Sequence, residues 1–191
     1  MKRWIAILAF LLVPSIFYAQ GFGIGLQVGP QIPISDFGDA FDVGLGFNGV
    51  FEYAVSNQFT LNFTSGYHWW SETAQEEGVE ATHRFTAIPL IAGFSFLFLP
   101  YGTSPFAGLK LGVHIETESI SISAQGIDLG SESETQTHFG ITPEVGVLIP
   151  VTQMLDIVLS AEYNHIFGTE GGIDVTYFGI NGGVLIHLGH H

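Results

Sequence analysis

The chain has 191 residues and no cysteine, and it carries 18 acidic residues against four lysines and arginines, a net charge of −14. The lack of cysteine excludes disulfides, thiol catalysis and cysteine-linked lipid anchors, and so acidic a chain lacks the basic footprint of a nucleic-acid-binding protein. Hydrophobic residues make up 47% of the sequence and charged residues 12%, whereas a soluble domain carries about 25% charge.

Residues 1–19 have the layout of a secretory signal peptide. Two basic residues precede an apolar run from Trp4 to Val13, and Pro14 and a short stretch ending at Ala19 follow. The run is too short for a membrane helix, which takes about 20 apolar residues. We therefore expect cleavage after Ala19 and a single domain over residues 20–191.

The rest of the chain alternates apolar and polar residues with a period of two, which predicts β-strands and no helix after the signal. In LDIVLSAEYNHIF, residues 155–167, Leu155, Ile157 and Leu159 alternate with Asp156 and Ser160. The same pattern predicts eight strands, at about 21–34, 43–55, 59–71, 84–99, 105–117, 137–151, 155–168 and 174–188.

The predicted connections differ in length at the two ends of the strands. Tight turns fall at residues 56–58, 101–104 and 152–154, and longer, more acidic connections at 36–42, 72–83, 118–136 and 169–172. This is typical of an outer-membrane barrel, with the long loops outside and the chain termini in the periplasm. Because lipid offers no partner to a free sheet edge, the sheet must close. The sequence thus predicts an all-β fold, an eight-stranded antiparallel up-and-down transmembrane β-barrel.

A soluble sandwich or lipocalin-like barrel is the alternative, but it would have an apolar inner face. Here the predicted inner face carries polar residues, mid-strand charges and ten glycines, as suits a narrow eight-stranded interior. Its charges are Glu52, Glu144, Glu162 and Lys110. Buried charges are rarely left unpaired, so we predict a lumen charge cluster that plugs the barrel. A gate, in which Lys110 exchanges carboxylate partners, is the alternative.

Several aromatic residues lie near the long-loop ends of the predicted strands, where an interfacial girdle is expected. They are Tyr67, Trp69, Trp70, Phe85, Tyr163 and Phe167. Beyond Ile115 the apolar positions change from odd to even, with Ile120 and Ile122. This predicts that the strands at 105–117 and 137–151 project above the membrane as a hairpin with these isoleucines on the axis side. A β-bulge is the alternative, because an extra residue also flips the register.

No motif predicts a metal, a cofactor or a catalytic group. The acidic loops lack calcium-loop spacing, and the eight histidines form no metal-binding motif. Ser160 and His165 are five residues apart on one predicted strand, hence on opposite faces, so they form no catalytic pair.

The segments IPISDFGDAF, VGLGFNGVFEYAVSNQFTLNFTSGY, PLIAGFSFLF, SPFAGLKLGV and FGITPEVGVLIPVTQMLDIVLSAEYNHIF resemble a known family. It comprises the small outer-membrane β-barrel proteins of Gram-negative bacteria, of the OmpA transmembrane-domain and OmpX type, often called porin family proteins. The resemblance covers the mature chain. Such barrels usually end in an aromatic residue, whereas here Leu188 stands nearest that role, before Gly189, His190 and His191.

The resemblance implies residence in the cell outer membrane, contact with outer-membrane lipid and lipopolysaccharide, and insertion by the barrel assembly machinery. It implies no cofactor, and it does not identify the extracellular partner. The expected function is non-enzymatic, in envelope integrity or surface interaction, or at most as a narrow gated channel. The alternatives are an OmpW-like transporter of small hydrophobic molecules and a lipid A-modifying enzyme.

Overall fold

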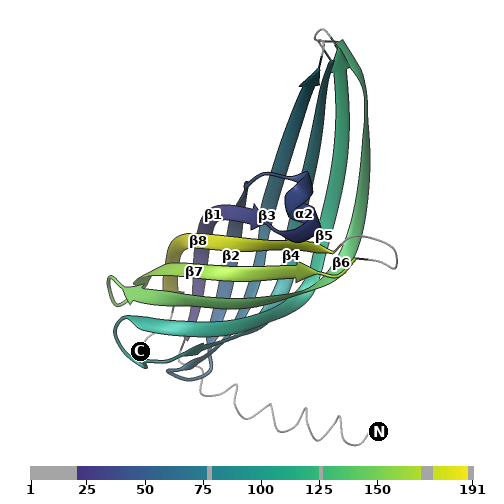
Figure 1. The fold of residues 1–191 in the computed structure, drawn as a ribbon. Helices are drawn as coiled ribbons and strands as arrows, with labels where there is room; N and C mark the ends of the chain where they lie inside the picture. Colours follow the sequence, from purple (N-terminus) through teal and green to yellow (C-terminus); the bar gives the residue numbers. More distant parts are fainter. Residues whose placement is uncertain (1–20, 77–78, 125–126, 169–173, 189–191) are drawn as a thin grey trace, which may run out of the picture.

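The strands form one closed antiparallel barrel in which each strand pairs with its neighbours in the chain and β1 pairs with β8 (Figure 1). The computed structural model describes residues 21–76, 79–124, 127–168 and 174–188, so the expected signal peptide lies outside the described part. The strands are β1 (Gly21–Pro33), β2 (Gly44–Ala54), β3 (Phe59–Glu76), β4 (Val79–Leu97), β5 (Ser104–Ala124), β6 (Ile127–Pro150), β7 (Leu155–Ile166) and β8 (Val175–Leu188). Among the described residues, no helix has the length and apolar character needed to cross a bilayer.

The two faces of the barrel follow the predicted alternation. Large apolar side chains such as Phe47, Leu111 and Ile180 are 43–53% exposed on the outer surface. Polar side chains such as Asn48 and Thr142 are no more than 1% exposed inside. This is the reverse of a soluble barrel, in which water would meet the polar face.

Inner-face glycines make room for large side chains in the narrow lumen. A Cβ atom on Gly46 would lie 2.5 Å from Nε2 of Gln31, and one on Gly179 would lie 2.7 Å from Oε1 of the same residue. A Cβ atom on Gly140 would lie 2.8 Å from Nε2 of His114. The glycines are therefore part of how the lumen is filled, because any side chain there would displace a buried polar group.

Two long connections that the sequence predicts as loops are strands instead. Residues 71–76, 79–86, 117–124 and 127–137 continue β3, β4, β5 and β6 beyond the point where β2 and β7 stop pairing. We call these four segments the extension, and Figure 1 shows it rising far above the barrel. The period of two continues here with serine and threonine in place of apolar residues, and threonine favours strands.

The predicted hairpin does project beyond the barrel, but it is only half of the extension. Alternation runs unbroken from Ile115 to Ile122, and the register between β5 and β6 shifts only between Ile122 and Ser123. Because the alternation continues from His114, which is fully buried in the lumen, Ile120 and Ile122 lie on the axis side, as predicted, and they are 46% and 42% exposed there. However, β3 and β4 project together with β5 and β6, because their pairing continues to Glu76 and Val79.

A short helix corrects the expectation of no helix after the signal. Helix α2 (Ser35–Ala40) lies in the connection between β1 and β2. Phe37 on this helix and the following Phe41 are 5–6% exposed, and the Phe37 ring lies 5.1 Å from the rings of both Trp70 and Phe85. Six residues are too few for a helical period to be visible in the sequence, and the docking of two phenylalanines in the barrel mouth holds the segment.

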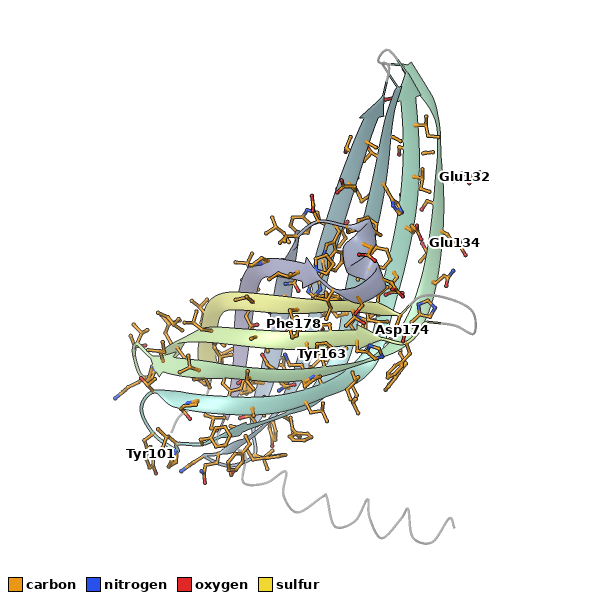
Figure 2. The ribbon with its side chains drawn as sticks, viewed as in Figure 1. Tyr101, Glu132, Glu134, Tyr163, Asp174 and Phe178 are labelled. Carbon is orange, nitrogen blue, oxygen red and sulfur yellow. The ribbon has the colours of Figure 1, made fainter. Side chains whose placement is uncertain are left out.

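The prediction of an interfacial aromatic girdle is wrong for two of the residues assigned to it. Trp70 and Phe85 point into the barrel, with exposed fractions of 1% and 8%. Neighbouring residues of a strand face opposite sides, so Trp69 and Trp70 cannot both face lipid. The other predicted members lie on the outer face, where Figure 2 shows Tyr163 beside Phe178, with ring centroids 5.2 Å apart. Tyr67 and Trp69 pack together at 5.9 Å, and Phe167 is 44% exposed.

Candidate functional site

The lumen charge cluster is centred on Lys110 of β5. Its Nζ lies 2.7 Å from Oε1 of Glu162 on β7 and 3.0 Å from Oε2 of Glu144 on β6. The three side chains are 2–4% exposed. Glu144 and Glu162 are cross-strand neighbours, which places two carboxylates side by side and lets one ammonium group bridge them.

Glu52 stands apart from this cluster. Among the described residues, Glu144 and Glu162 are the ion-pair partners of Lys110, and Glu52 is not within ion-pair distance. Its side chain lines a cavity of about 10 Å³ shared with Lys110 and Glu144, which has room for at most one water molecule. Glu52 also lines a much larger vestibule, of about 760 Å³, that opens at the short-turn end of the barrel.

Above the cluster, a chain of hydrogen bonds crosses the lumen. Asn181 donates from Nδ2 to Oε2 of Glu162, at 3.2 Å, and Gln31 donates from Nε2 to Oδ1 of Asn181, at 3.1 Å. The backbone oxygen of Gln31 accepts a bond from Nε1 of Trp70, at 3.0 Å. The ion cluster is therefore connected through Asn181 and Gln31 to the aromatic layer at the barrel mouth.

Two more layers close the lumen toward the extension. His68 bonds through Nε2 to Oδ1 of Asn48 and through Nδ1 to the hydroxyl of Tyr177, both at 2.9 Å. A neutral histidine has one donor and one acceptor nitrogen, which matches an amide on one side of His68 and a hydroxyl on the other. Above them, an apolar cluster fills the mouth, with Phe37, Phe41, Trp70, Phe85, Ala87, Ile166 and Tyr177. These described layers fill the lumen between the vestibule and the extension with buried side chains.

The described residues show no constellation for metal binding, since no group of three or more potential ligands comes together among them. Ser160 is buried on the lumen side, while His165 bonds through Nδ1 to the hydroxyl of Thr176, at 3.1 Å. The side chains of Ser160 and His165 alternate along β7 to opposite faces, as the sequence indicates.

The extension forms a second candidate site. The sequence predicted a projecting hairpin here but missed its carboxylate-rich face, because it assigned these acidic residues to loops. Carboxylates gather on the axis-side face of the extension and at its base: Glu72, Glu116, Glu118, Glu132 and Glu134. Figure 2 labels Glu132 and Glu134 on β6. Their shared even numbering is the signal that places them on one face. Glu118 contacts His83, and Glu116 contacts His138, both at 2.6 Å.

Comparison with known proteins agrees with this architecture. The chain belongs to the family described as "Outer membrane protein beta-barrel domain", which matches residues 5–184. Its strands, lumen and apolar outer face are those of a protein of the cell outer membrane. No curated protein matches the chain.

Three solved structures illustrate the likeness in fold. Neisserial surface protein A is 18% identical, with a TM-score of 0.61 over 89% of this chain and 99% of its own. A major outer membrane protein from Thermus thermophilus is 10% identical, with a TM-score of 0.53, over 87% and 99% of the two chains. Ail, the attachment invasion locus protein of Yersinia pestis, is 14% identical, with a TM-score of 0.51, over 87% and 99%.

Proposed function

We propose that this protein is a non-enzymatic surface-interaction protein, whose barrel is the anchor and whose extension binds a cationic partner outside the cell. The observation that carries the proposal is the carboxylate-rich axis-side face of the extension, held out on four paired strands. Barrels of this class turn their short connections to the periplasm and their long ones outward, so the extension is the part that meets other molecules.

The filled lumen supports an anchor over a channel or a transporter. Lys110 is held by two carboxylates, and the layers of His68 and of Phe37 lie above it. A carrier of small hydrophobic molecules would need an apolar pocket near the extension end, whereas the apolar cluster there is packed with its own side chains. Ser160 and His165 lie on opposite faces of β7, so they do not form the nucleophile and base that a lipid A-modifying enzyme would require.

The charge of the face defines the chemistry of the partner. Glu132 and Glu134 are exposed and lie on the same side of β6 as the partly exposed His138. A patch of carboxylates attracts cationic groups and repels anions. The structure of Ail was solved in complex with the heparin analogue sucrose octasulfate, and this face has the opposite preference to such a polyanion. A lysine- or arginine-rich segment is the matching partner.

Binding of an oligolysine peptide to the full protein in vesicles of neutral lipid tests the proposal. Replacing Glu132 and Glu134 together by glutamine should weaken binding roughly 2- to 30-fold, because each exposed charge contact contributes about 0.2–1 kcal/mol. Glutamines at Ser131 and Ser133, the alternate residues of the same strand, are the matched control and should leave binding unchanged. Equal losses in the two variants, or no loss in the first, would contradict the proposal.

A further inference from the structure

The small cavity beside Lys110 adjoins the vestibule at the short-turn end of the barrel. The cavity has a volume of about 10 Å³ and the vestibule a volume of about 760 Å³. Four residues line both spaces: Glu52, Thr60, Leu97 and Leu148. Because Glu52 belongs to both, its carboxylate lies where a solute in the vestibule would reach the small cavity.

The polar wall of the small cavity carries oxygen atoms that lack a hydrogen-bond donor. Gln27 and Asn62 line this wall, and each is 6% exposed. Oε1 of Gln27 and Oδ1 of Asn62 have no hydrogen-bond partner among the described residues. Nδ2 of Asn62 donates to Oγ of Ser95, at 2.8 Å, so the amide oxygen is the atom left over. Buried polar atoms are nearly always satisfied in folded proteins, and two unpartnered acceptors on one wall therefore indicate a ligand that donates.

The charge balance favours a cation over a water molecule as this donor. Lys110 also lines the cavity, but it is bound to Glu144 and Glu162, at 3.0 Å and 2.7 Å. After residue 20 the only other lysine or arginine is Arg84, which lies on the extension. Three carboxylates, including Glu52, therefore face one ammonium group in this part of the lumen. Buried charges are rarely left uncompensated, and a water molecule would not balance the charge of Glu52.

The opposite wall is apolar and fits a hydrocarbon chain. Phe106, Leu148 and Val158 are 5–8% exposed and pack as one cluster, and Leu97 packs against it. A primary ammonium group has three donors and no acceptor, and it is about as large as the one water molecule for which the cavity has room. A calcium ion would need six to eight oxygen ligands, more than this wall offers. An ammonium group at the end of an alkyl chain matches both walls.

We propose that the vestibule binds a primary alkylammonium ion. Its ammonium group lies in the small cavity and donates to Glu52, Gln27 and Asn62, and its alkyl chain lies along Leu97 and Leu148. Because barrels of this class turn their short connections to the periplasm, the ligand is a small amine of the periplasm. The site does not depend on the proposed cationic partner of the extension, which would bind at the other end of the barrel.

A series of small ligands tests the chemistry of the site on the unaltered protein. Binding of butylammonium to the full protein is followed by ligand-observed NMR at pH 8, where a primary amine is still protonated. Nanodiscs of phosphatidylcholine hold the protein, since this lipid has no primary amine. Butyltrimethylammonium keeps the charge and the chain but has no N–H donor, and butanol keeps the chain without the charge, so both should bind at least about tenfold more weakly. Absence of butylammonium binding, equally tight binding of butyltrimethylammonium, or displacement by sodium at equal concentration would overturn the proposal.

Variants matched in charge locate the ammonium group. Glu52→Gln keeps the size of the side chain and removes its charge, so butylammonium binding should fall at least about 30-fold. Asp156→Asn removes one charge from the vestibule wall, where Asp156 is bonded to Nε2 of His187, at 2.8 Å, and it should weaken binding at most about fivefold. Replacing Glu132 and Glu134 of the extension by glutamine should leave binding unchanged. Equal losses in Glu52→Gln and Asp156→Asn, or a loss in the extension variant, would attribute binding to the overall negative charge and refute the site.

Discussion

Replacing Lys110 by methionine tests whether the lumen cluster is a structural plug. Methionine keeps much of the length of lysine but removes the ammonium that lies 2.7 Å and 3.0 Å from two carboxylates. Removing one partner of a buried pair costs about 3–5 kcal/mol. Because the loss of Lys110 leaves two carboxylates behind, both at most 4% exposed, we expect a loss of at least about 3 kcal/mol in the free energy of unfolding.

Urea unfolding in lipid vesicles measures this loss, and two further variants locate its cause. Lys110→Met combined with Glu144→Gln and Glu162→Gln should recover most of the stability, because no uncompensated charge remains. His83→Gln removes a pair whose side chains are 33% and 53% exposed, so it should cost less than about 1 kcal/mol. A loss below about 1 kcal/mol in Lys110→Met would show that water reaches the cluster and would refute the plug.

Three further predictions follow from the layers above the cluster and from the fold. Phe37→Ala should weaken docking of the 34–43 connection by about 3 kcal/mol, seen as faster limited proteolysis there, whereas Val43→Ala, at a residue 60% exposed, should change nothing. In planar bilayers, neither the wild type nor Lys110→Ala should show a steady conductance, because the layers of His68 and Phe37 remain. Steady channels in Lys110→Ala would instead support a gate. Cysteines at Thr135 and Asn57 should react differently with an impermeant reagent on intact cells, with Thr135 the accessible one; equal labelling would refute the orientation.

The sequence by itself determined the class of fold, because alternation in a membrane barrel is a local property. Each strand must turn apolar residues to lipid and polar ones inward, so the pattern around Leu155 and Ile157 already indicated which face of each strand meets lipid. The same parity placed Lys110, Glu144 and Glu162 on one face. It also placed Ile120 on the axis side of the projecting strand.

Only the tertiary structure decided what depends on distance across the lumen. Parity puts Glu52 on the inner face with the other charges, but the register and tilt of the strands leave it at the vestibule while Glu144 and Glu162 reach Lys110. The participation of β3 and β4 in the extension was hidden for a related reason. Its strands carry no lipid-facing residues, so the apolar signal ends at the membrane while the backbone pairing continues through Glu76 and Val79. Strand pairing requires a neighbouring backbone rather than apolar side chains. The continued pairing therefore leaves no signal in the apolar pattern and is seen only in the assembled structure.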